Sequence, residues 1–165
     1  MLKIIVTGPE SSGKTTLCKA LSTHFEIPFT EEYAREYLNN LESDYTQSHL
    51  LEIAKGQLLS EHNAQILDTD LITIKIWSEY KYGNCNQWII EQIEKQKTEK
   101  RFYLLCKADI PWEGDPQREN PNDRVELFEI YKQELDNLGH NYFIVEGENR
   151  IESSISEISS LITII

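Results

Sequence analysis

Apolar residues in this chain form short continuous runs, which alternate with longer stretches in which they recur every three or four positions. The first run, Leu2 to Thr7, is rich in β-branched residues and stops at Gly8, which is typical of a strand buried on both faces. Lys14 to Phe25 follows with its apolar positions in helical spacing. The chain therefore opens with a predicted strand, a glycine-containing loop and a helix.

The same alternation continues along the rest of the sequence. Further strands are predicted at Ile27 to Thr30, Ala64 to Leu67, Phe102 to Cys106 and Tyr142 to Val145, and further helices at Glu32 to Leu41, Gln47 to His62, Leu71 to Tyr82, Asn86 to Lys97, Arg124 to Leu138 and Ile151 to Ile162. Strands that alternate with helices indicate an α/β fold, here three layers around a five-stranded, mainly parallel sheet. At this length we expect residues 1–165 to form a single domain.

One long segment interrupts the alternation. Residues 109–123 contain three prolines and many polar side chains, with little periodicity. Loops of this length inside a compact domain are usually functional lids or disordered segments. We therefore expect a lid at about residues 109–124.

Charge and hydropathy exclude several classes of function. The net charge of −12 opposes binding to nucleic acid, which depends on clustered Lys and Arg. The basic cluster, which comprises Lys95, Lys97, Lys100 and Arg101, ends a predicted helix, where cations complement the carbonyl end of the dipole. No apolar stretch is long enough for a membrane span or a signal sequence, so we expect a cytoplasmic protein without membrane contact. The sequence leaves the oligomeric state undefined.

The three cysteines, Cys18, Cys85 and Cys106, are odd in number and widely spaced. This spacing indicates neither a disulfide framework nor a zinc site. We expect them to be buried free thiols.

The loop after the first strand carries the clearest chemical motif, Gly8-Pro9-Glu10-Ser11-Ser12-Gly13-Lys14-Thr15, which matches the P-loop pattern G-x-x-x-x-G-K-S/T. Glycines let successive backbone N–H groups point inward, and the helix N-terminus adds positive potential for phosphates. Lys14 is expected to reach the β- and γ-phosphates of ATP, and the Thr15 hydroxyl to bind Mg²⁺. The predicted ATP-binding residues are Gly8, Glu10, Ser11, Ser12, Gly13, Lys14, Thr15 and Thr16. The alternative is a structural Gly-Ser turn that caps the helix.

Two carboxylates follow the third strand. A Mg²⁺-nucleotide site needs an acidic residue at the end of a strand beside the phosphate loop, and Asp68 is our candidate for the metal shell. Asp70 is expected to face the phosphoryl acceptor and to accept or orient its hydroxyl proton. The alternative is that both residues only cap the next helix.

Charged residues also follow the second strand. Glu31, Glu32 and Arg35 lie where the carboxyl ends of parallel strands bind ligands. Glu32 and Arg35 are therefore predicted to contact a polyhydroxylated substrate, and Glu32 competes with Asp70 as the catalytic carboxylate. The alternative is a surface ion pair between Glu32 and Arg35.

The lid supplies two arginines and an aromatic residue. Arg118 and Arg124 are expected to close over the transferring phosphoryl group and to exclude water. Trp112 either stacks on a flat substrate ring or anchors the lid to the core.

Four segments with specific residues occur in order along the chain: Gly8-Pro9-Glu10-Ser11-Ser12-Gly13-Lys14-Thr15-Thr16-Leu17, Glu32-Tyr33-Ala34-Arg35-Glu36, Asp68-Thr69-Asp70 and Pro111-Trp112-Glu113-Gly114-Asp115-Pro116-Gln117-Arg118. With them the chain resembles, over nearly its whole length, the ribosylnicotinamide kinase domain of NadR-type proteins. The resemblance implies a nucleoside/nucleotide kinase-like P-loop fold, ATP and Mg²⁺ as cofactors, and phosphorylation of the 5′-hydroxyl of nicotinamide riboside in NAD salvage. It also implies that Asp109 to Arg124 is the lid and that Gly147 to Arg150 lies near the adenine.

NadR-type proteins usually carry an adenylyltransferase domain with an H-x-G-H signature as well. The sequence has only Gly139-His140, so adenylyl transfer is not expected. Two other functions stay open at this point. One is an ATP-binding or ATPase regulatory module without a small-molecule acceptor. The other is a GTP-dependent switch, since Cys106-Lys107-Ala108-Asp109 partly imitates the guanine-reading N-K-x-D sequence.

Overall fold

The computed structural model of the chain describes residues 1–163 and contains five strands and seven helices in these residues. The strands are β1 (Lys3–Thr7), β2 (Phe29–Thr30), β3 (Ile66–Asp68), β4 (Arg101–Cys106) and β5 (Asn141–Val145). The helices are α1 (Lys14–Phe25), α2 (Tyr33–Asn39), α3 (Gln47–Ser60), α4 (Leu71–Tyr82), α5 (Gln87–Gln96), α6 (Arg124–Leu138) and α7 (Arg150–Thr163). Every strand and helix predicted from the sequence is confirmed, with ends that differ by at most a few residues.

The five strands form one sheet in the order β2-β3-β1-β4-β5, and all neighbouring strands are parallel. β1 lies at the centre, where Ile4 pairs with Ile66 of β3 on one side and with Phe102 of β4 on the other. In a parallel sheet the carboxyl ends of the strands meet at one edge, and ligands of such folds bind there. The loop that follows β1 therefore leaves the middle of this edge.

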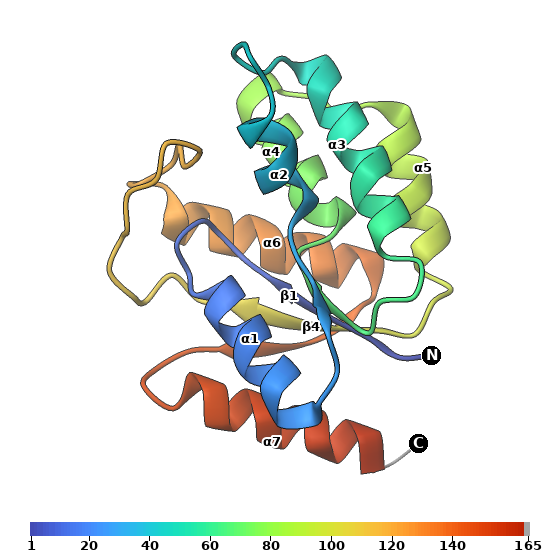
Figure 1. Cartoon of the computed structure of the whole chain (residues 1–165), viewed down its shortest axis with the longest axis vertical. Helices are drawn as coiled ribbons and strands as arrows, with labels where there is room; N and C mark the ends of the chain where they lie inside the picture. Colours follow the sequence, from blue (N-terminus) through green and yellow to red (C-terminus); the bar gives the residue numbers. More distant parts are fainter. Residues whose placement is uncertain (164–165) are drawn as a thin grey trace.

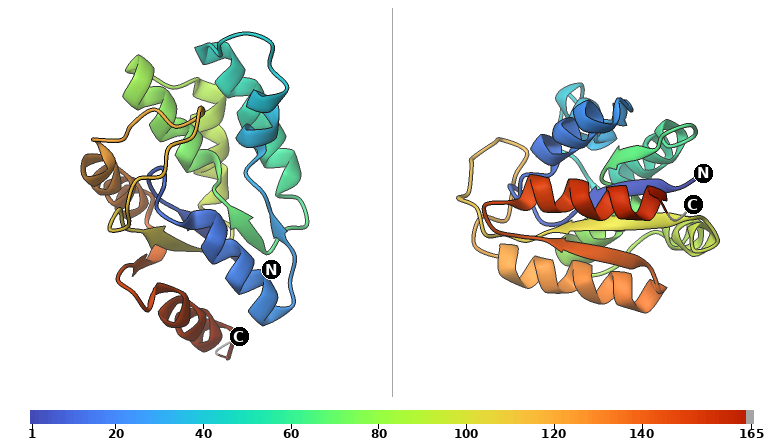
Figure 2. Two further views of the ribbon diagram at one scale, coloured as in Figure 1. Left: turned by 60° about the vertical axis from the view of Figure 1, so that its left-hand side comes forward. Right: turned by 90° about the horizontal axis from the view of Figure 1, so that it is seen from below.

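Helices cover both faces of the sheet, which gives the three layers expected for the fold (Figures 1 and 2). α1 and α7 pack on one face, and α3, α4, α5 and α6 on the other. The alternation of side chains along β1 divides the core in the same way, since Ile4 and Val6 belong to the cluster under α1 and α7, whereas Ile5 belongs to the opposite cluster. The strands are therefore apolar on both sides, which explains their continuous apolar runs.

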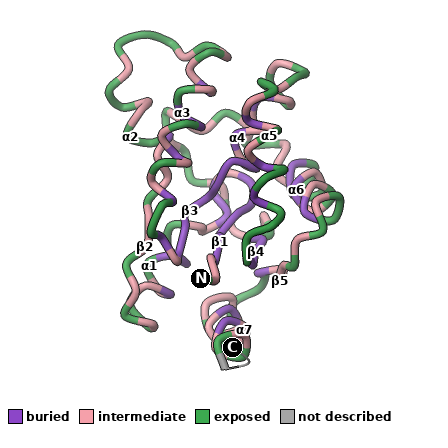
Figure 3. The backbone as a smooth tube through the Cα atoms, turned by 90° about the vertical axis from the view of Figure 1, so that its right-hand side faces the viewer, coloured by how far each residue is buried: buried purple, intermediate pink, exposed green. Residues whose placement is uncertain are grey.

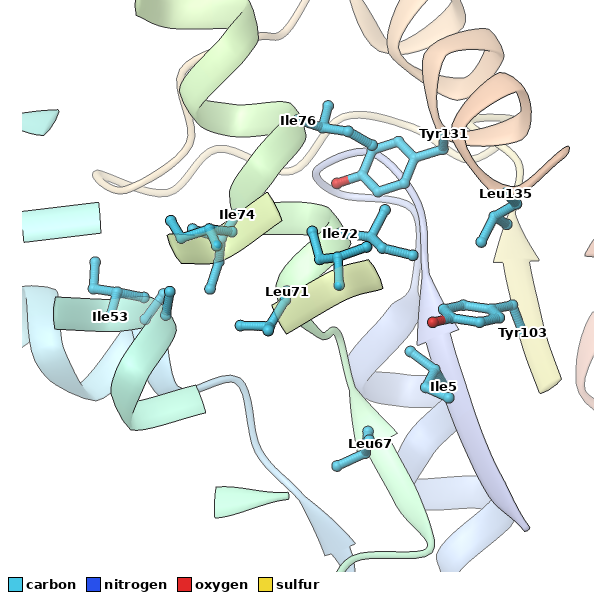
Figure 4. Close-up of a cluster of buried hydrophobic side chains, with 14 of the residues drawn as sticks. Ile5, Ile53, Leu67, Leu71, Ile72, Ile74, Ile76, Tyr103, Tyr131 and Leu135 are labelled. Atoms are coloured by element: carbon cyan, nitrogen blue, oxygen red, sulfur yellow. The ribbon is translucent and has the colours of Figure 1, made fainter. Parts of the chain in front are cut away.

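The larger core cluster lies between the sheet and α4. Ile72 of α4 packs near Ile5 of β1 and Tyr103 of β4, and Leu71 lies above Leu67 of β3 (Figure 4). All these side chains are fully buried or nearly so, and the buried course of β1, β3 and β4 is visible in Figure 3. Burial of each large aliphatic side chain contributes about 1.5–3 kcal/mol. The start of α4 is thus fixed tightly against the sheet.

The basic cluster at residues 95–101 differs from the sequence-based expectation. Lys95, Lys97 and Lys100 are exposed near the end of α5, but Arg101 is the first residue of β4 and its side chain is buried. The Arg101 guanidinium donates to Asp70 at 3.0 Å and to Glu61 at 2.5 Å. A buried charge is costly unless it is paired, and these two carboxylates are its partners. Arg101 is therefore part of the core and not of a helix end.

Cys18 and Cys106 are buried free thiols, as predicted, and Cys85 is half-buried and also free. Within residues 1–163, no helix combines the length and the apolar character that crossing a lipid bilayer requires.

Candidate active site

The loop between β1 and α1 has the backbone conformation that a phosphate cradle requires. Gly8 has a φ of 135°, and a Cβ atom at this position would lie 2.6 Å from the carbonyl oxygen of Cys106. Ser11 and Gly13 both have left-handed backbones, with φ values of 55° and 84°. Turns that combine right-handed and left-handed residues form anion-binding concavities from successive N–H groups, and here the concavity opens onto the N-terminus of α1. The arrangement fits a chain of phosphates.

Side chains of the same loop are held by its own backbone. Lys14 Nζ donates to the Pro9 carbonyl oxygen at 2.8 Å, and Ser12 Oγ donates to the same oxygen at 2.6 Å. Lys14 lines the cavity described below. Its ammonium group therefore stands at the loop, where it can exchange the carbonyl for a phosphate oxygen.

Thr15 and Asp68 meet at the end of β3. The Thr15 hydroxyl donates to Asp68 Oδ2 at 2.6 Å, whereas Asp68 Oδ1 is buried and accepts no hydrogen bond from residues 1–163. Burial raises the pKa of Asp68, and the Thr15 hydrogen bond and the Lys14 charge oppose this shift. A buried carboxylate oxygen without a donor, beside a hydroxyl, matches the hard oxygen ligands of Mg²⁺, which takes few protein ligands in phosphate sites. The two residues thus fit the metal predicted for them.

A single cavity of about 600 Å³ extends from the phosphate loop to the lid and to the helices on the α4 side of the sheet. The loop from Gly8 to Thr16 forms part of its lining, including each predicted ATP-binding residue. Apolar and aromatic side chains line it as well, among them Leu38, Ile76, Trp77, Leu127 and Tyr131. The cavity therefore combines the predicted phosphate loop with apolar and aromatic side chains that suit a flat organic group.

Glu32 and Arg35 line the same cavity. Glu32 is half-buried at the N-terminus of α2, and burial raises its pKa, while the charges of Lys14 and Arg35 lower it. Arg35 Nη1 forms an ion pair with Asp115 of the lid at 2.5 Å. The partner of Arg35 is thus the lid, and not Glu32 as the surface-pair alternative supposed. The Glu32 carboxylate faces a site that also holds Lys14.

Asp70 does not lie at the cavity, and the expectation that it faces the acceptor is wrong. Its side chain is 0% exposed; Oδ1 accepts from the Ile72 amide at 3.0 Å, and Oδ2 accepts from Arg101 and from the Tyr103 hydroxyl. Asp70 therefore caps α4 and balances the buried Arg101 charge. The capping alternative holds for Asp70 but not for Asp68.

The lid, residues 109–124, is joined to the phosphate loop through Glu10 and Ser11. The Glu10 carboxylate accepts from the backbone amides of Glu119 and Asn120 at 2.9–3.2 Å. Ser11 Oγ accepts from the amide of Glu113 at 2.8 Å. The segment leaves β4 and arches past this loop before it reaches α6 (gold in Figure 1). Glu10, predicted as an ATP-binding residue, thus engages the lid with its side chain.

The two lid arginines occupy different environments. Arg118 lines the cavity, and its Nη1 donates to the Glu113 carbonyl and, at 3.5 Å, to Ser11 Oγ. Arg124 instead donates to the carbonyls of Ser11 and Ile110 at 3.1 and 2.9 Å, and its guanidinium lies 5.6 Å from the centre of the Trp112 ring. Neither Arg124 nor Trp112 lines the cavity. Both residues anchor the lid in this structure, and the catalytic role of Arg124 and the substrate contact of Trp112 stay predictions.

The apolar and aromatic lining of the cavity contains residues that the sequence did not single out. Trp77 of α4 lines it and donates through its indole N–H to the Tyr45 hydroxyl at 3.0 Å. Lys81, one turn further along α4, donates to Tyr45 at 2.5 Å and to Glu119 of the lid at 2.9 Å. This group, formed by Tyr45, Trp77, Lys81 and Glu119, fixes the orientation of the Trp77 ring and ties α4 to the lid. Nothing in the sequence indicated this group, because an aromatic residue at core spacing on a helix looks like an ordinary core residue.

Asp109 is the last residue of the segment Cys106-Lys107-Ala108-Asp109, which partly matches the guanine-reading sequence N-K-x-D. Its Oδ2 accepts from the Gly147 amide at 2.7 Å, and its Oδ1 pairs with Arg150. Both oxygens are thus engaged inside the protein, which disfavours their use in reading guanine.

A family model described as an AAA domain matches residues 3–152. The trifunctional NAD biosynthesis/regulator protein NadR of Escherichia coli (strain K12) is 21% identical over 159 residues, which cover 88% of this chain and 38% of that protein. The chain thus spans about two fifths of the length of this curated relative.

Solved structures show the same fold. The crystal structure of a NadR protein in complex with NR has a TM-score of 0.72 at 24% identity, over 96% of this chain and 51% of the other. The structure of deoxyadenosine kinase from M. mycoides with dCMP and dCDP has a TM-score of 0.66 at 14% identity, over 97% of this chain and all of the other. The three-layer α/β P-loop fold predicted from the sequence is therefore confirmed.

Proposed function

Because this chain belongs to the AAA domain family, whose model matches residues 3–152, we propose that it is an ATP- and Mg²⁺-dependent kinase that phosphorylates a hydroxyl of a nucleoside-like molecule. The observation that carries the proposal is the cavity, whose lining combines the phosphate loop with apolar and aromatic side chains and the Glu32 carboxylate. Transfer of the phosphoryl group to water alone would not require an apolar and aromatic lining for an acceptor. Nicotinamide riboside, with its 5′-hydroxyl as acceptor, is the first candidate substrate, because of the four NadR-like segments and the fold shared with NadR.

The phosphate loop holds the donor. In this proposal the loop amides and Lys14 bind the β- and γ-phosphates of ATP, and Thr15 and Asp68 hold Mg²⁺, which neutralises phosphate charge when it is bound. Arg118 stabilises the negative charge of the transferring group from the lid side. Arg35 and Asp115 keep the lid in place above the acceptor.

The transfer itself is a single displacement at the γ-phosphorus. The acceptor oxygen forms the new P–O bond, the bond from the γ-phosphorus to the β,γ-bridging oxygen breaks, and ADP leaves. The Glu32 carboxylate accepts the hydroxyl proton, so that charge and atoms balance. The acceptor ring lies against Trp77, whose orientation Tyr45 fixes.

The proposal is tested by ADP release from MgATP with and without candidate acceptors. We expect nicotinamide riboside to accelerate ADP formation and to be converted to its 5′-phosphate, detected by mass spectrometry. Acceleration by another nucleoside alone would retain the kinase and replace the substrate. ADP release that no acceptor accelerates would support a regulatory ATP-binding module instead, and GTP in place of ATP tests donor selectivity.

Glu32→Gln should lower kcat by about 10²- to 10⁴-fold, the usual contribution of a positioned general base, with little change in the KM for ATP. Because burial raises the pKa of Glu32, the base is protonated at a higher pH than an ordinary glutamate. The wild-type kcat should therefore fall as the pH is lowered through this raised pKa and stay level above it. The residual activity of the variant should lack this step, which a pH series of initial rates measures.

Glu36→Gln is the matched control for Glu32→Gln, because Glu36 is an exposed carboxylate on the same helix, outside the cavity. It should retain wild-type kcat and its pH profile. Equal kcat values for the Glu32 variant and wild type would assign proton acceptance to solvent or to the acceptor itself.

A further inference from the structure

The guanidinium of Arg150 connects three segments that are far apart in the sequence. Its Nη1 donates to the carbonyl oxygen of Ser12 in the phosphate loop at 2.7 Å. Its Nη2 pairs with Asp109 after β4, and its Nε donates to the Gly147 carbonyl at 3.4 Å in the turn before α7. Asp109 also accepts a hydrogen bond from the Gly147 amide at 2.7 Å, which links the segment after β4 to the turn before α7. Only 12% of the Arg150 side chain is exposed, so its position is well defined by these partners.

The bond to Ser12 constrains the orientation of the Ser12–Gly13 peptide in the phosphate loop. In a planar trans peptide the C=O of one residue and the N–H of the next point in opposite directions. When Arg150 holds the Ser12 carbonyl on its own side, the Gly13 amide is turned the other way, and both residues line the cavity. Arg150 also approaches closely, since a Cβ atom at Gly13 would lie 3.1 Å from its Nη1.

We propose that Arg150 is a positioning residue that orients the Ser12–Gly13 peptide, so that the Gly13 amide points at the donor phosphates and the loop is preformed before ATP binds. The inference rests on the proposed function, because it assumes that the loop binds the phosphates of ATP. Arg150 acts through the loop backbone and not through the adenine. Asp109 holds the guanidinium in the required plane, which a lysine ammonium could not reproduce, because it lacks the planar fork of donors.

The distinguishing probe is inorganic tripolyphosphate, which has the phosphates of ATP but no base or ribose. Calorimetry gives the Kd of MgATP and of tripolyphosphate for wild type and for Arg150→Gln and Arg150→Lys. Loss of a charge-assisted hydrogen bond should weaken both ligands by the same factor, about ten- to hundredfold for the glutamine variant. The lysine variant should also weaken both.

Chemical rescue provides a second readout. Arg150→Ala should regain affinity for tripolyphosphate when guanidinium ion is added at concentrations that leave wild-type unfolding unchanged. The matched control is Glu146→Gln, which breaks the adjacent exposed ion pair with Lys107 but touches nothing in the loop. It should bind both ligands as wild type does.

Each other outcome overturns the inference in a recognisable way. If the Arg150 variants weaken MgATP but not tripolyphosphate, Arg150 contacts the base or ribose and does not position the loop. If folded variants bind both ligands normally, the bond to Ser12 has no role in phosphate binding. If wild type binds neither ligand, the proposed function fails together with the inference.

Discussion

Replacing Lys14 with alanine should reduce kcat/KM for ATP by about a thousandfold or more, because in the proposed kinase the Lys14 ammonium group stabilises the transferring phosphoryl group. The fold should be unaffected. Within residues 1–163 the Lys14 side chain makes one hydrogen bond, to the Pro9 carbonyl, and its loss leaves a carbonyl that water can reach from the cavity. Coupled detection of ADP with the best acceptor measures the loss, and circular dichroism checks the fold.

Lys19→Ala is the matched control for Lys14→Ala, since Lys19 is an exposed lysine on the same helix, α1. It should turn over at the wild-type rate. A folded Lys14→Ala protein with full activity would falsify the assignment of the phosphate loop as the donor site.

Replacing Arg101 with methionine should lower the free energy of unfolding by about 3–5 kcal/mol, the usual cost of removing one partner of a buried ion pair. The substitution preserves much of the side-chain volume but leaves Asp70 and Glu61 as buried carboxylates without their counter-charge. Burial already raises the pKa of Glu61 to about 7 even with Arg101 present. Urea unfolding at pH 8, where Glu61 of the wild type is largely ionised, measures the change.

Two further variants separate charge from packing at Arg101. Lys97→Met removes an exposed pair with Glu94 and should change stability by less than about 1 kcal/mol. Adding Glu61→Gln and Asp70→Asn to Arg101→Met should recover part of the loss, because no buried charge is then left unpaired. A loss for Arg101→Met as small as that for Lys97→Met would show that water reaches the cluster.

Local sequence signals located the phosphate loop, whose residues line the cavity. The loop is contiguous, so the residue types and their spacing specify its backbone turns and the groups predicted to contact phosphate. Asp68 could be predicted as a metal ligand because it ends an apolar strand, and this strand pairs with β1, which leads into the phosphate loop. The helix and strand boundaries followed from periodicity, because each face of the sheet is covered by helices whose apolar stripes are regular.

The role of Asp70 could not be read in the same way. If the strand had continued, Asp68 and Asp70 would have pointed to the same side, since side chains alternate along a strand. Thr69 breaks this alternation with a left-handed backbone, φ 67°, while its amide still bonds to the Val6 carbonyl at 2.9 Å. Asp70 is thereby turned into the core. A threonine gives little warning of such a conformation, which glycine or asparagine would signal.

The role of Arg101 and the aromatic lining of the cavity depend on contacts between distant segments, which the sequence pattern does not show. Arg101 looked like an exposed helix end because its partners, Glu61 and Asp70, lie more than thirty residues earlier in the chain. Trp77 and Lys81 looked like an ordinary amphipathic helix. The folded chain shows that both line the cavity, and that Tyr45, from the loop before α3, hydrogen-bonds to both.

The position of β1 in the sheet bears on the order in which the site can form. β1 pairs with β3 at residues 66–68 and with β4 at residues 101–106, so neither neighbour of the central strand is close to it in sequence. Such non-local pairing is slow, because loop-closure entropy must be overcome before the contacts compensate for it. During synthesis, about a hundred further residues would have to be made before β3 and β4 could both pair with β1. The phosphate loop, although it is encoded within the first fifteen residues, would therefore acquire its shape late in folding.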